Sequence, residues 1–112
     1  LAETVANLCR VLDVRPEIVV HDLHPDYHSS RFAAEYAQRA GLPCRAVQHH
    51  QAHIAAVAAE HRHAGPLVGL ALDGVGLGDD GAAWGGELLL VEGARCTRLG
   101  HLQPLALPGG DR

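Results

Sequence analysis

The pattern of apolar residues changes at Gly65-Pro66, and this change restricts the possible folds more than any other feature of the chain. Before it, segments with helical periodicity alternate with short strand-like runs, in the order 1–12, 18–20, 29–40, 44–47 and 50–63. After it, runs separated by glycine-rich turns predict successive strands at 67–72, 85–92 and 96–102. Alternation favours parallel strands with crossover helices, whereas successive strands favour an antiparallel meander. We therefore expect an α/β chain that joins the C-terminal part of one subdomain (1–64) to the start of a second (65–112).

The composition is that of a globular protein, with 47% hydrophobic and 20% charged residues among 112. The formal charge of -4 gives no general attraction to nucleic acid or to anionic membranes, so we expect neither as a partner. The apolar runs are far shorter than the roughly 20 residues that span a bilayer. No signal peptide opens the chain, which favours a cytoplasmic protein.

The three cysteines, Cys9, Cys44 and Cys96, are odd in number and form no CxxC pair. They therefore indicate neither a disulfide framework nor a zinc knuckle, and we expect small buried apolar residues in a reducing compartment. Because the chain begins at Leu1, without a methionine, we also expect a fragment of a longer protein.

Metal-type ligands gather in the run His49-His50-Gln51-Ala52-His53. If this segment is helical, His49 and His53 project from one face and can share a divalent metal, zinc or iron, in a site with open coordination positions. Glu60 falls on nearly the same face, whereas His50 lies to one side and is predicted to pack beside the pair. The alternative is that these are ordinary surface or core histidines.

A glycine-dense run, Asp73 to Gly81, follows about twenty residues later. It contains the letters of a GxGxxG dinucleotide motif, but turn and strand residues follow where that motif needs a helix. We instead predict a hairpin in which Asp73, Gly74, Gly76 and Gly78 approach the phosphates of a nucleotide, with Asp73 placed to hold a bridging Mg²⁺. The alternative is a hairpin whose glycines only provide positive φ angles.

Five further residues give weaker signals. Asp22 at a strand end and Gly109-Gly110 near the C-terminus are candidates for loops that face a ligand, and the glycines are included among the predicted nucleotide-binding residues. A capping or turn role is the alternative for each. Trp84 is predicted to pack rather than to stack on adenine, while Glu87 is either a polar contact at the site or a solvated strand residue.

Taken together, four ordered motifs make the chain resemble the HypF family of carbamoyltransferases, which mature [NiFe]-hydrogenases. The motifs cover nearly the whole chain and lie at residues 19–27, 47–53, 71–87 and 107–111. The resemblance implies a piece of the domain that HypF shares with the universal tRNA threonylcarbamoyltransferases, which has the actin-like, sugar-kinase-like ATPase fold. The pattern change at Gly65-Pro66 would then be the junction of its two subdomains.

The resemblance also implies a reaction. Enzymes of this family use carbamoyl phosphate and ATP to form carbamoyl adenylate, and they transfer the carbamoyl group to the C-terminal cysteine of HypE for cyanide ligand synthesis. By the same resemblance, His49 and His53 correspond to the metal-binding pair and Asp73 lies in the loop beside the nucleotide phosphates. The nucleophile belongs to the partner, so no cysteine of this chain need be catalytic.

Several family features are missing from the chain: the acylphosphatase-like domain, the paired CxxC zinc modules, the adenylate-forming domain and a later aspartate of the metal site. We therefore expect the chain alone to bind metal weakly and to be inactive. Three other functions remain as alternatives, namely a tRNA-modifying relative, a non-catalytic binding module of the same fold, and a stand-alone metal carrier.

Overall fold

The computed structural model describes residues 1–105 and has a mixed α/β fold. It divides into two compact units, Leu1–Gln48 and His49–Arg112. Within the described residues, no helix is both long enough and apolar enough to cross a membrane. The subdomain junction predicted at Gly65-Pro66 concerns the parent fold and stays a prediction.

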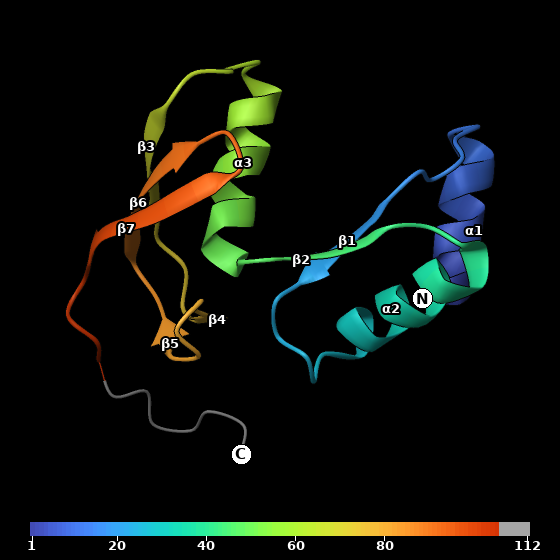
Figure 1. Cartoon of the computed structure of the whole chain (residues 1–112), viewed down its shortest axis with the longest axis horizontal. Helices are drawn as coiled ribbons and strands as arrows, with labels where there is room; N and C mark the ends of the chain where they lie inside the picture. Colours follow the sequence, from blue (N-terminus) through green and yellow to red (C-terminus); the bar gives the residue numbers. More distant parts are fainter. Residues whose placement is uncertain (106–112) are drawn as a thin grey trace. The chain divides into compact units, whose positions relative to one another are not determined.

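The first unit alternates helices and strands, as the sequence predicts. Its elements in chain order are α1 (Ala2–Val11), β1 (Val19–Asp22), α2 (His28–Ala40) and β2 (Cys44–Val47) (Figure 1). The two strands pair in parallel, with Val19 opposite Cys44 and Asp22 opposite Val47. A parallel pair needs a crossover connection, and α2 provides it.

Small side chains let α2 pack on this strand pair, because its buried residues are Ser30, Ala33 and Ala37. The helix ends at Gly41, whose positive φ of 65° gives the left-handed conformation that glycine adopts without strain. The N-cap residue of α2 is Tyr27, whose side chain makes no capping hydrogen bond. Ser30 lies inside the helix, and its hydroxyl donates to the carbonyl of Asp22 at 3.2 Å.

The second unit begins with one helix and continues entirely as strands. Its elements are α3 (His49–Glu60), β3 (Leu67–Ala71), β4 (Gly76–Leu77), β5 (Ala83–Trp84), β6 (Glu87–Glu92) and β7 (Arg95–His101). The meander is confirmed, since β3, β6 and β7 form an antiparallel sheet in that order. The glycine-dense run adds the short β4–β5 hairpin, so five strands replace the three that the pattern predicts.

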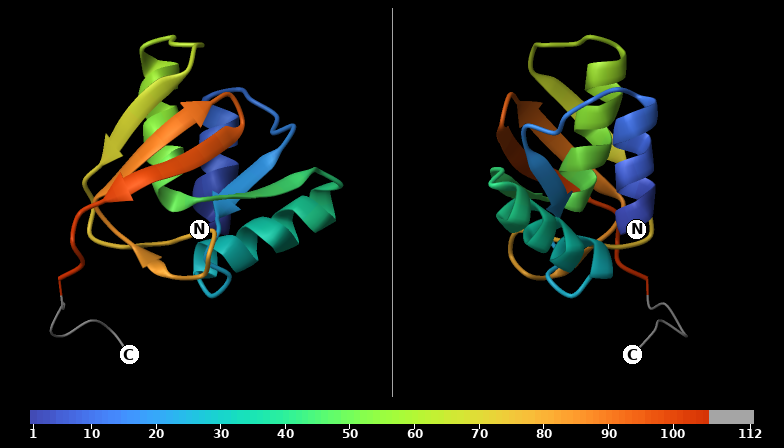
Figure 2. Two further views of the ribbon diagram at one scale, coloured as in Figure 1. Left: turned by 60° about the vertical axis from the view of Figure 1, so that its left-hand side comes forward. Right: turned by 90° about the vertical axis from the view of Figure 1, so that its right-hand side faces the viewer.

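Helix α3 lies beside β3 and β6 of this sheet (Figure 2). The core comprises side chains from the helix, this sheet and the β4–β5 hairpin: Ile54, Ala71, Trp84, Leu89 and Val91. Gly69 allows the close approach of α3 to β3, because a Cβ atom there would lie 2.5 Å from the Ile54 side chain. The N-terminal turn of α3 is thereby held near the end of β3, where Asp73 follows.

The cysteines form no disulfide, but the expectation that all three are buried is wrong. Cys9 and Cys96 are half-buried and Cys44 is exposed. Cys44 opens β2, where neighbouring residues are also exposed, because α2 makes fewer contacts with β2 than with β1. None of the three lies in a cluster of metal-ligating side chains within residues 1–105.

Candidate metal centre

The histidine pair lies on the first two turns of α3. His49 begins the helix and His53 follows one turn later, so that their rings meet edge to face with centroids 4.8 Å apart. The two Nε2 atoms are 3.2 Å from each other. The predicted helix and the shared face of His49 and His53 are therefore confirmed.

Asp73 completes a cluster with this pair. Its Oδ2 atom lies 2.8 Å from Nε2 of His49 and 3.6 Å from Nε2 of His53. The three side chains are the one group among residues 1–105 whose atoms could hold a metal ion together. From the sequence, Asp73 was assigned to the phosphate loop alone, and its contact with both histidines was missed.

The distances fit a shared metal ion. Ligand atoms bound to one tetrahedral ion at about 2.0–2.2 Å lie about 3.3–3.6 Å apart. The cluster shows 2.8, 3.2 and 3.6 Å, so the His49–Asp73 contact would lengthen by roughly half an ångström around an ion. Both Asp73 oxygens are buried and neither has a well-aligned hydrogen-bond donor in the described structure, as expected of a carboxylate placed to bind a cation.

The cluster is open on one side, because the side chain of His53 is 58% exposed while those of His49 and Asp73 are 29% and 27% exposed. Three protein ligands with an accessible side match a catalytic ion better than a closed structural one. Imidazole and carboxylate ligands suit both zinc and iron, so the donor set leaves the metal open.

Glu60 does not join the cluster. It is exposed at the far end of α3 and is absent from the group of potential ligands. The carboxylate of the cluster comes instead from Asp73, which follows β3 in the chain.

His50 is fully buried and lies against the other oxygen of the aspartate, with its Nε2 atom 2.8 Å from Oδ1 of Asp73. Burial lowers the pKa of His50 below its ordinary value, against an opposing effect of Asp73. The imidazole is therefore neutral near pH 7. The prediction that His50 packs beside the pair is confirmed.

The glycines of the β4–β5 hairpin are explained by close packing. A Cβ atom at Gly76 would lie 2.7 Å from Cβ of His49, and one at Gly78 would lie 2.2 Å from Nε1 of Trp84. Neither residue has a positive φ; among the hairpin glycines only Gly81 does. The close packing of Gly76 thus places the hairpin directly against the candidate metal ligand.

Gly74 differs from these two glycines. It is exposed, and a Cβ atom there would meet nothing within 4 Å. A pocket of about 240 Å³ adjoins Asp73 and is also lined by Leu72, Gly85, Gly86 and residues 102–105. The structure thus provides space beside the carboxylate and backbone of residues 73–74.

Trp84 is buried, as predicted, and its indole Nε1 donates to Oδ1 of Asp80 at 2.9 Å. The same oxygen accepts the backbone N–H of Ala82 at 3.0 Å. These bonds, that of Ala82 most strongly, lower the pKa of Asp80. Asp80 thus closes the hairpin turn and orients the indole.

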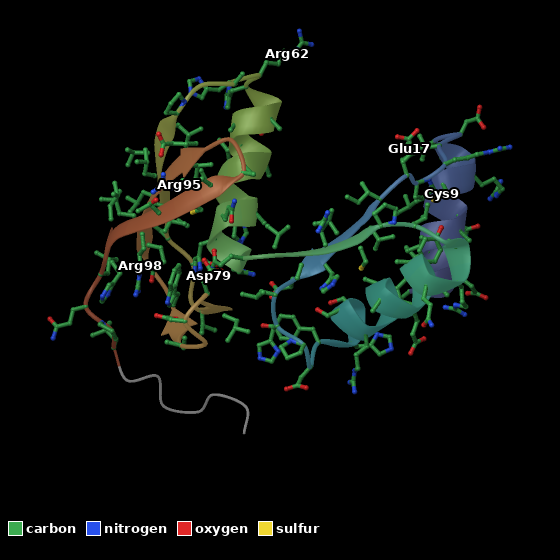
Figure 3. The ribbon with its side chains drawn as sticks, in the orientation of Figure 1. Cys9, Glu17, Arg62, Asp79, Arg95 and Arg98 are labelled. Atoms are coloured by element: carbon green, nitrogen blue, oxygen red, sulfur yellow. The ribbon has the colours of Figure 1, made fainter. Side chains whose placement is uncertain are left out.

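The sequence predicts Glu87 to be either a polar contact at the site or a solvated strand residue, and it is neither. It is fully buried and accepts two hydrogen bonds from Arg98, at 2.6 Å from Nε and 2.8 Å from Nη2, and a third from the N–H of Gly85 at 2.9 Å. Burial alone would raise the pKa of Glu87, but these bonds outweigh it and the pKa is lowered. Arg98 projects from β7 (Figure 3) and its guanidinium lies 4.2 Å from the centre of the Trp84 ring.

The remaining candidates lie elsewhere. In the first unit, Oδ1 of Asp22 accepts the N–H of His24 at 2.8 Å, which is the turn role considered as its alternative. Gly109 and Gly110 lie outside the described residues.

Family models match both halves of the chain. The model described as the HypF Kae1-like domain matches residues 1–60. A second, described as the second subdomain of the Kae1-like domain of carbamoyltransferase, matches residues 69–112.

Similar proteins are much longer than this chain. Carbamoyltransferase HypF2 of Cupriavidus necator is 68% identical over 112 residues, which are 100% of the chain and 14% of that protein. Carbamoyltransferase HypF of Rhizobium leguminosarum bv. viciae is 52% identical over 110 residues, 98% of the chain and 14% of that protein. The chain therefore spans about a seventh of these relatives.

Two solved structures are also similar. HypF of T. kodakarensis superposes with a TM-score of 0.83 at 41% identity, over 97% of this chain and 14% of that one. Full-length HypF in a phosphate- and nucleotide-bound form gives a TM-score of 0.78 at 38% identity, over 87% of this chain and 15% of that one.

Proposed function

Since the chain belongs to the family of HypF Kae1-like domains, we propose that it serves in a carbamoyltransferase of [NiFe]-hydrogenase maturation. In this proposal the parent protein transfers a carbamoyl group from carbamoyl phosphate, through carbamoyl adenylate formed with ATP, to the C-terminal cysteine of HypE. The identity to HypF proteins over the whole chain supports it. The activity of the whole enzyme depends on domains beyond this chain.

The observation that carries the proposal is the cluster of His49, His53 and Asp73. These side chains would hold a divalent ion, zinc or iron, with one side accessible to a substrate. When bound, the ion supplies positive charge to the phosphate of the adenylate. The chain itself contributes ligand positions fixed by α3 and by the turn after β3, so that little reorganisation is needed when the substrate arrives.

The backbone at Asp73 and Gly74 is the proposed site for the nucleotide phosphates, with Mg²⁺ as the bridging ion. Exposed Gly74 leaves its backbone accessible, and the adjoining pocket provides space for a ligand. The similar HypF structure in a phosphate- and nucleotide-bound form supports nucleotide binding by this domain. Gly76 and Gly78 are proposed to act through the position of the hairpin, and Gly109 and Gly110, outside the described residues, stay proposed nucleotide-binding residues.

The proposed parent fold is the actin-like, sugar-kinase-like ATPase fold, with a junction between subdomains near Gly65-Pro66. Its support is that one family model ends at residue 60 and the second-subdomain model begins at residue 69. The change from alternating elements to a meander at the same place agrees with such a junction.

The proposed nucleophile belongs to HypE rather than to this chain. Cys96 is the one cysteine of the second unit within residues 49–105, and burial raises the pKa of its thiol. A protonated thiol is a poor nucleophile, and Cys96 is not among the potential metal ligands.

A cytoplasmic location is proposed on the same grounds as the reaction, because hydrogenase maturation in this scheme uses ATP and a free cysteine thiol.

Metal content and carbamoyl transfer in the parent-length protein test the proposal together. The wild type is compared with His49→Ala/His53→Ala for bound zinc and iron and for transfer to a peptide that ends in cysteine. We expect the double variant to lose both metal and transfer. His61→Ala is the matched control, because His61 is exposed just beyond α3 and outside the cluster.

The outcome tests the proposed metal site separately from the family assignment. Unchanged metal and transfer in a folded double variant would make the histidine pair structural, and the proposed mechanism would have to be abandoned. Loss of transfer without loss of metal would place the ion elsewhere in the parent protein.

A further inference from the structure

We propose that His50 is a positioning residue that fixes how Asp73 presents its carboxylate to a metal ion, an inference that rests on the proposed metal centre. The inference is based on the different neighbours of the two Asp73 oxygens. Oδ2 faces the ligand atoms of His49 and His53, whereas Oδ1 lies 2.8 Å from Nε2 of His50. The two oxygens thus contact different imidazoles: Oδ1 lies beside the buried His50, and Oδ2 faces the proposed ligand pair.

Consecutive residues of one helix can do this because side chains one position apart point about 100° away from each other. His49 and His50 accordingly meet Asp73 on different oxygens, with their rings 5.3 Å apart and nearly perpendicular. A helix that begins at His49 therefore supplies both a ligand and a support for a second ligand.

The surroundings of His50 restrict its movement. The residue is 0% exposed, and its ring lies 6.4 Å from that of Trp84. Trp84 is itself held by its bond to Asp80 and by the guanidinium of Arg98. A buried imidazole with so little freedom keeps its Nε2 atom at a defined position, which a mobile surface residue would not do.

The consequence for the carboxylate is a defined coordination mode. With Nε2 of His50 in contact with Oδ1, Asp73 is oriented so that Oδ2 faces the proposed ligands. A carboxylate without that contact can rotate and bind through both oxygens. Outer contacts of this kind typically change metal affinity by about 10–100-fold. His50 is therefore assigned an effect on metal binding without being a ligand.

The test uses the parent-length protein and Co²⁺ as a spectroscopic probe of the site. We compare the wild type with His50→Phe, which keeps the ring and removes the nitrogens, and with His50→Gln, which restores a side-chain N–H at a similar reach. Co²⁺ affinity is expected to fall about 10–100-fold in His50→Phe. It is expected to recover in His50→Gln, with the number of ligands in the visible spectrum unchanged.

Two controls separate positioning from general damage. His61→Gln repeats the same chemical change at an exposed histidine and should leave Co²⁺ affinity unchanged. Far-ultraviolet circular dichroism of each variant without metal reports folding. If His50→Phe does not fold, His50→Leu, which also lacks a donor, replaces it: Co²⁺ affinity lower than in His50→Gln supports the positioning role, and equal affinity contradicts it.

Three results would overturn the inference. Equal Co²⁺ affinity in wild type and folded His50→Phe would make the contact incidental. Loss of a ligand from the spectrum of either variant would make His50 a metal ligand. A wild type that binds no Co²⁺ in a manner dependent on His49 and His53 would remove the proposed metal centre itself, which is the distinct failure of the proposed function.

Discussion

Two clusters of charged and polar side chains in the second unit are built in opposite ways. The Glu87–Arg98 cluster is closed: the buried carboxylate accepts three hydrogen bonds from Arg98 and Gly85. The His49–His53–Asp73 cluster is open: a buried carboxylate faces imidazole nitrogens and the side chain of His53 is 58% exposed. Both hold an acidic residue, but only the first contains enough donors to satisfy it.

From this difference we propose that the closed cluster stabilises the fold and that the open cluster binds a cation. A buried carboxylate is costly unless donors or a cation compensate it. Arg98 compensates Glu87 within the chain. For Asp73, we propose that an external cation provides the compensation, because imidazole nitrogens carry lone pairs that a metal ion accepts.

The largest effect on stability is expected from Glu87→Ala, which leaves Arg98 without its partner. Breaking a buried pair by removing one partner costs about 3–5 kcal/mol. Because the Arg98 side chain is 27% exposed, we expect a value near the lower limit, about 3 kcal/mol. Hydrogen exchange of the β6 and β7 amides in the parent-length protein measures the free energy of local opening. Protection that stays at the wild-type level would show that the closed cluster is not a stabilising element.

Asp73→Asn is expected to act on binding rather than on stability. Removing a metal ligand should reduce metal affinity by more than about 100-fold, because losing a residue that only contacts a ligand already reduces it by about 10–100-fold. The metal-free protein should not lose stability, because the change removes the charge of a carboxylate whose buried oxygens accept no hydrogen bond within residues 1–105. Metal titration and thermal unfolding without metal measure the two effects. A strongly destabilised metal-free variant with normal affinity would reverse the assigned roles.

Gly76→Ala tests whether the hairpin supports the open cluster. The added methyl group would lie 2.7 Å from Cβ of His49, so the helix or the hairpin must shift. Overpacking of this kind costs about 1–3 kcal/mol. We expect metal affinity to fall about tenfold, which corresponds to about 1.4 kcal/mol. Gly100→Ala is the matched control, because a Cβ atom there meets nothing within 4 Å, and equal affinities in the two variants would contradict the proposed support.

The smallest effect is expected from acid. The pKa of Glu87 is lowered in the folded protein, so its ion pair contributes stability above the ordinary pKa of 4.5 and loses that contribution as the pH falls through the lower folded value. Wild-type stability should therefore fall more steeply below pH 4.5 than that of Glu87→Gln, which cannot titrate. Thermal unfolding from pH 6 to pH 3 measures both slopes, and parallel slopes would count against the closed pair.

The sequence predicted only the histidine pair of the open cluster, because that pair depends on local helix geometry alone. Residues four apart on a helix always share a face, so the pairing of His49 and His53 followed from spacing alone. The addition of Asp73 depends on how closely α3 packs on β3, which Gly69 permits. No periodicity within either element contains that information. The strand-rich second half was predicted for the same reason as the histidine pair, because alternation along a strand is a local property.

The closed cluster was missed because its partners pair across two strands. Glu87 lies directly opposite His101, and Arg98 lies opposite Leu89 after a shift in register. The irregularity between Leu88 and Leu89 brings Arg98 diagonally onto the face of Glu87. The signal available was an acidic and a basic residue on neighbouring strands of one hairpin, and the shift in register concealed their pairing.

Anomalous X-ray diffraction from metal-loaded crystals of the parent-length protein is the most direct test of the central claim. Data collected above and below the absorption edge of the bound metal locate the ion without reference to activity. The account predicts one peak about 2.0–2.2 Å from Nε2 of His49, Nε2 of His53 and an oxygen of Asp73. A metal-loaded protein whose peak lies elsewhere, with these three side chains bonded only to one another, would contradict it.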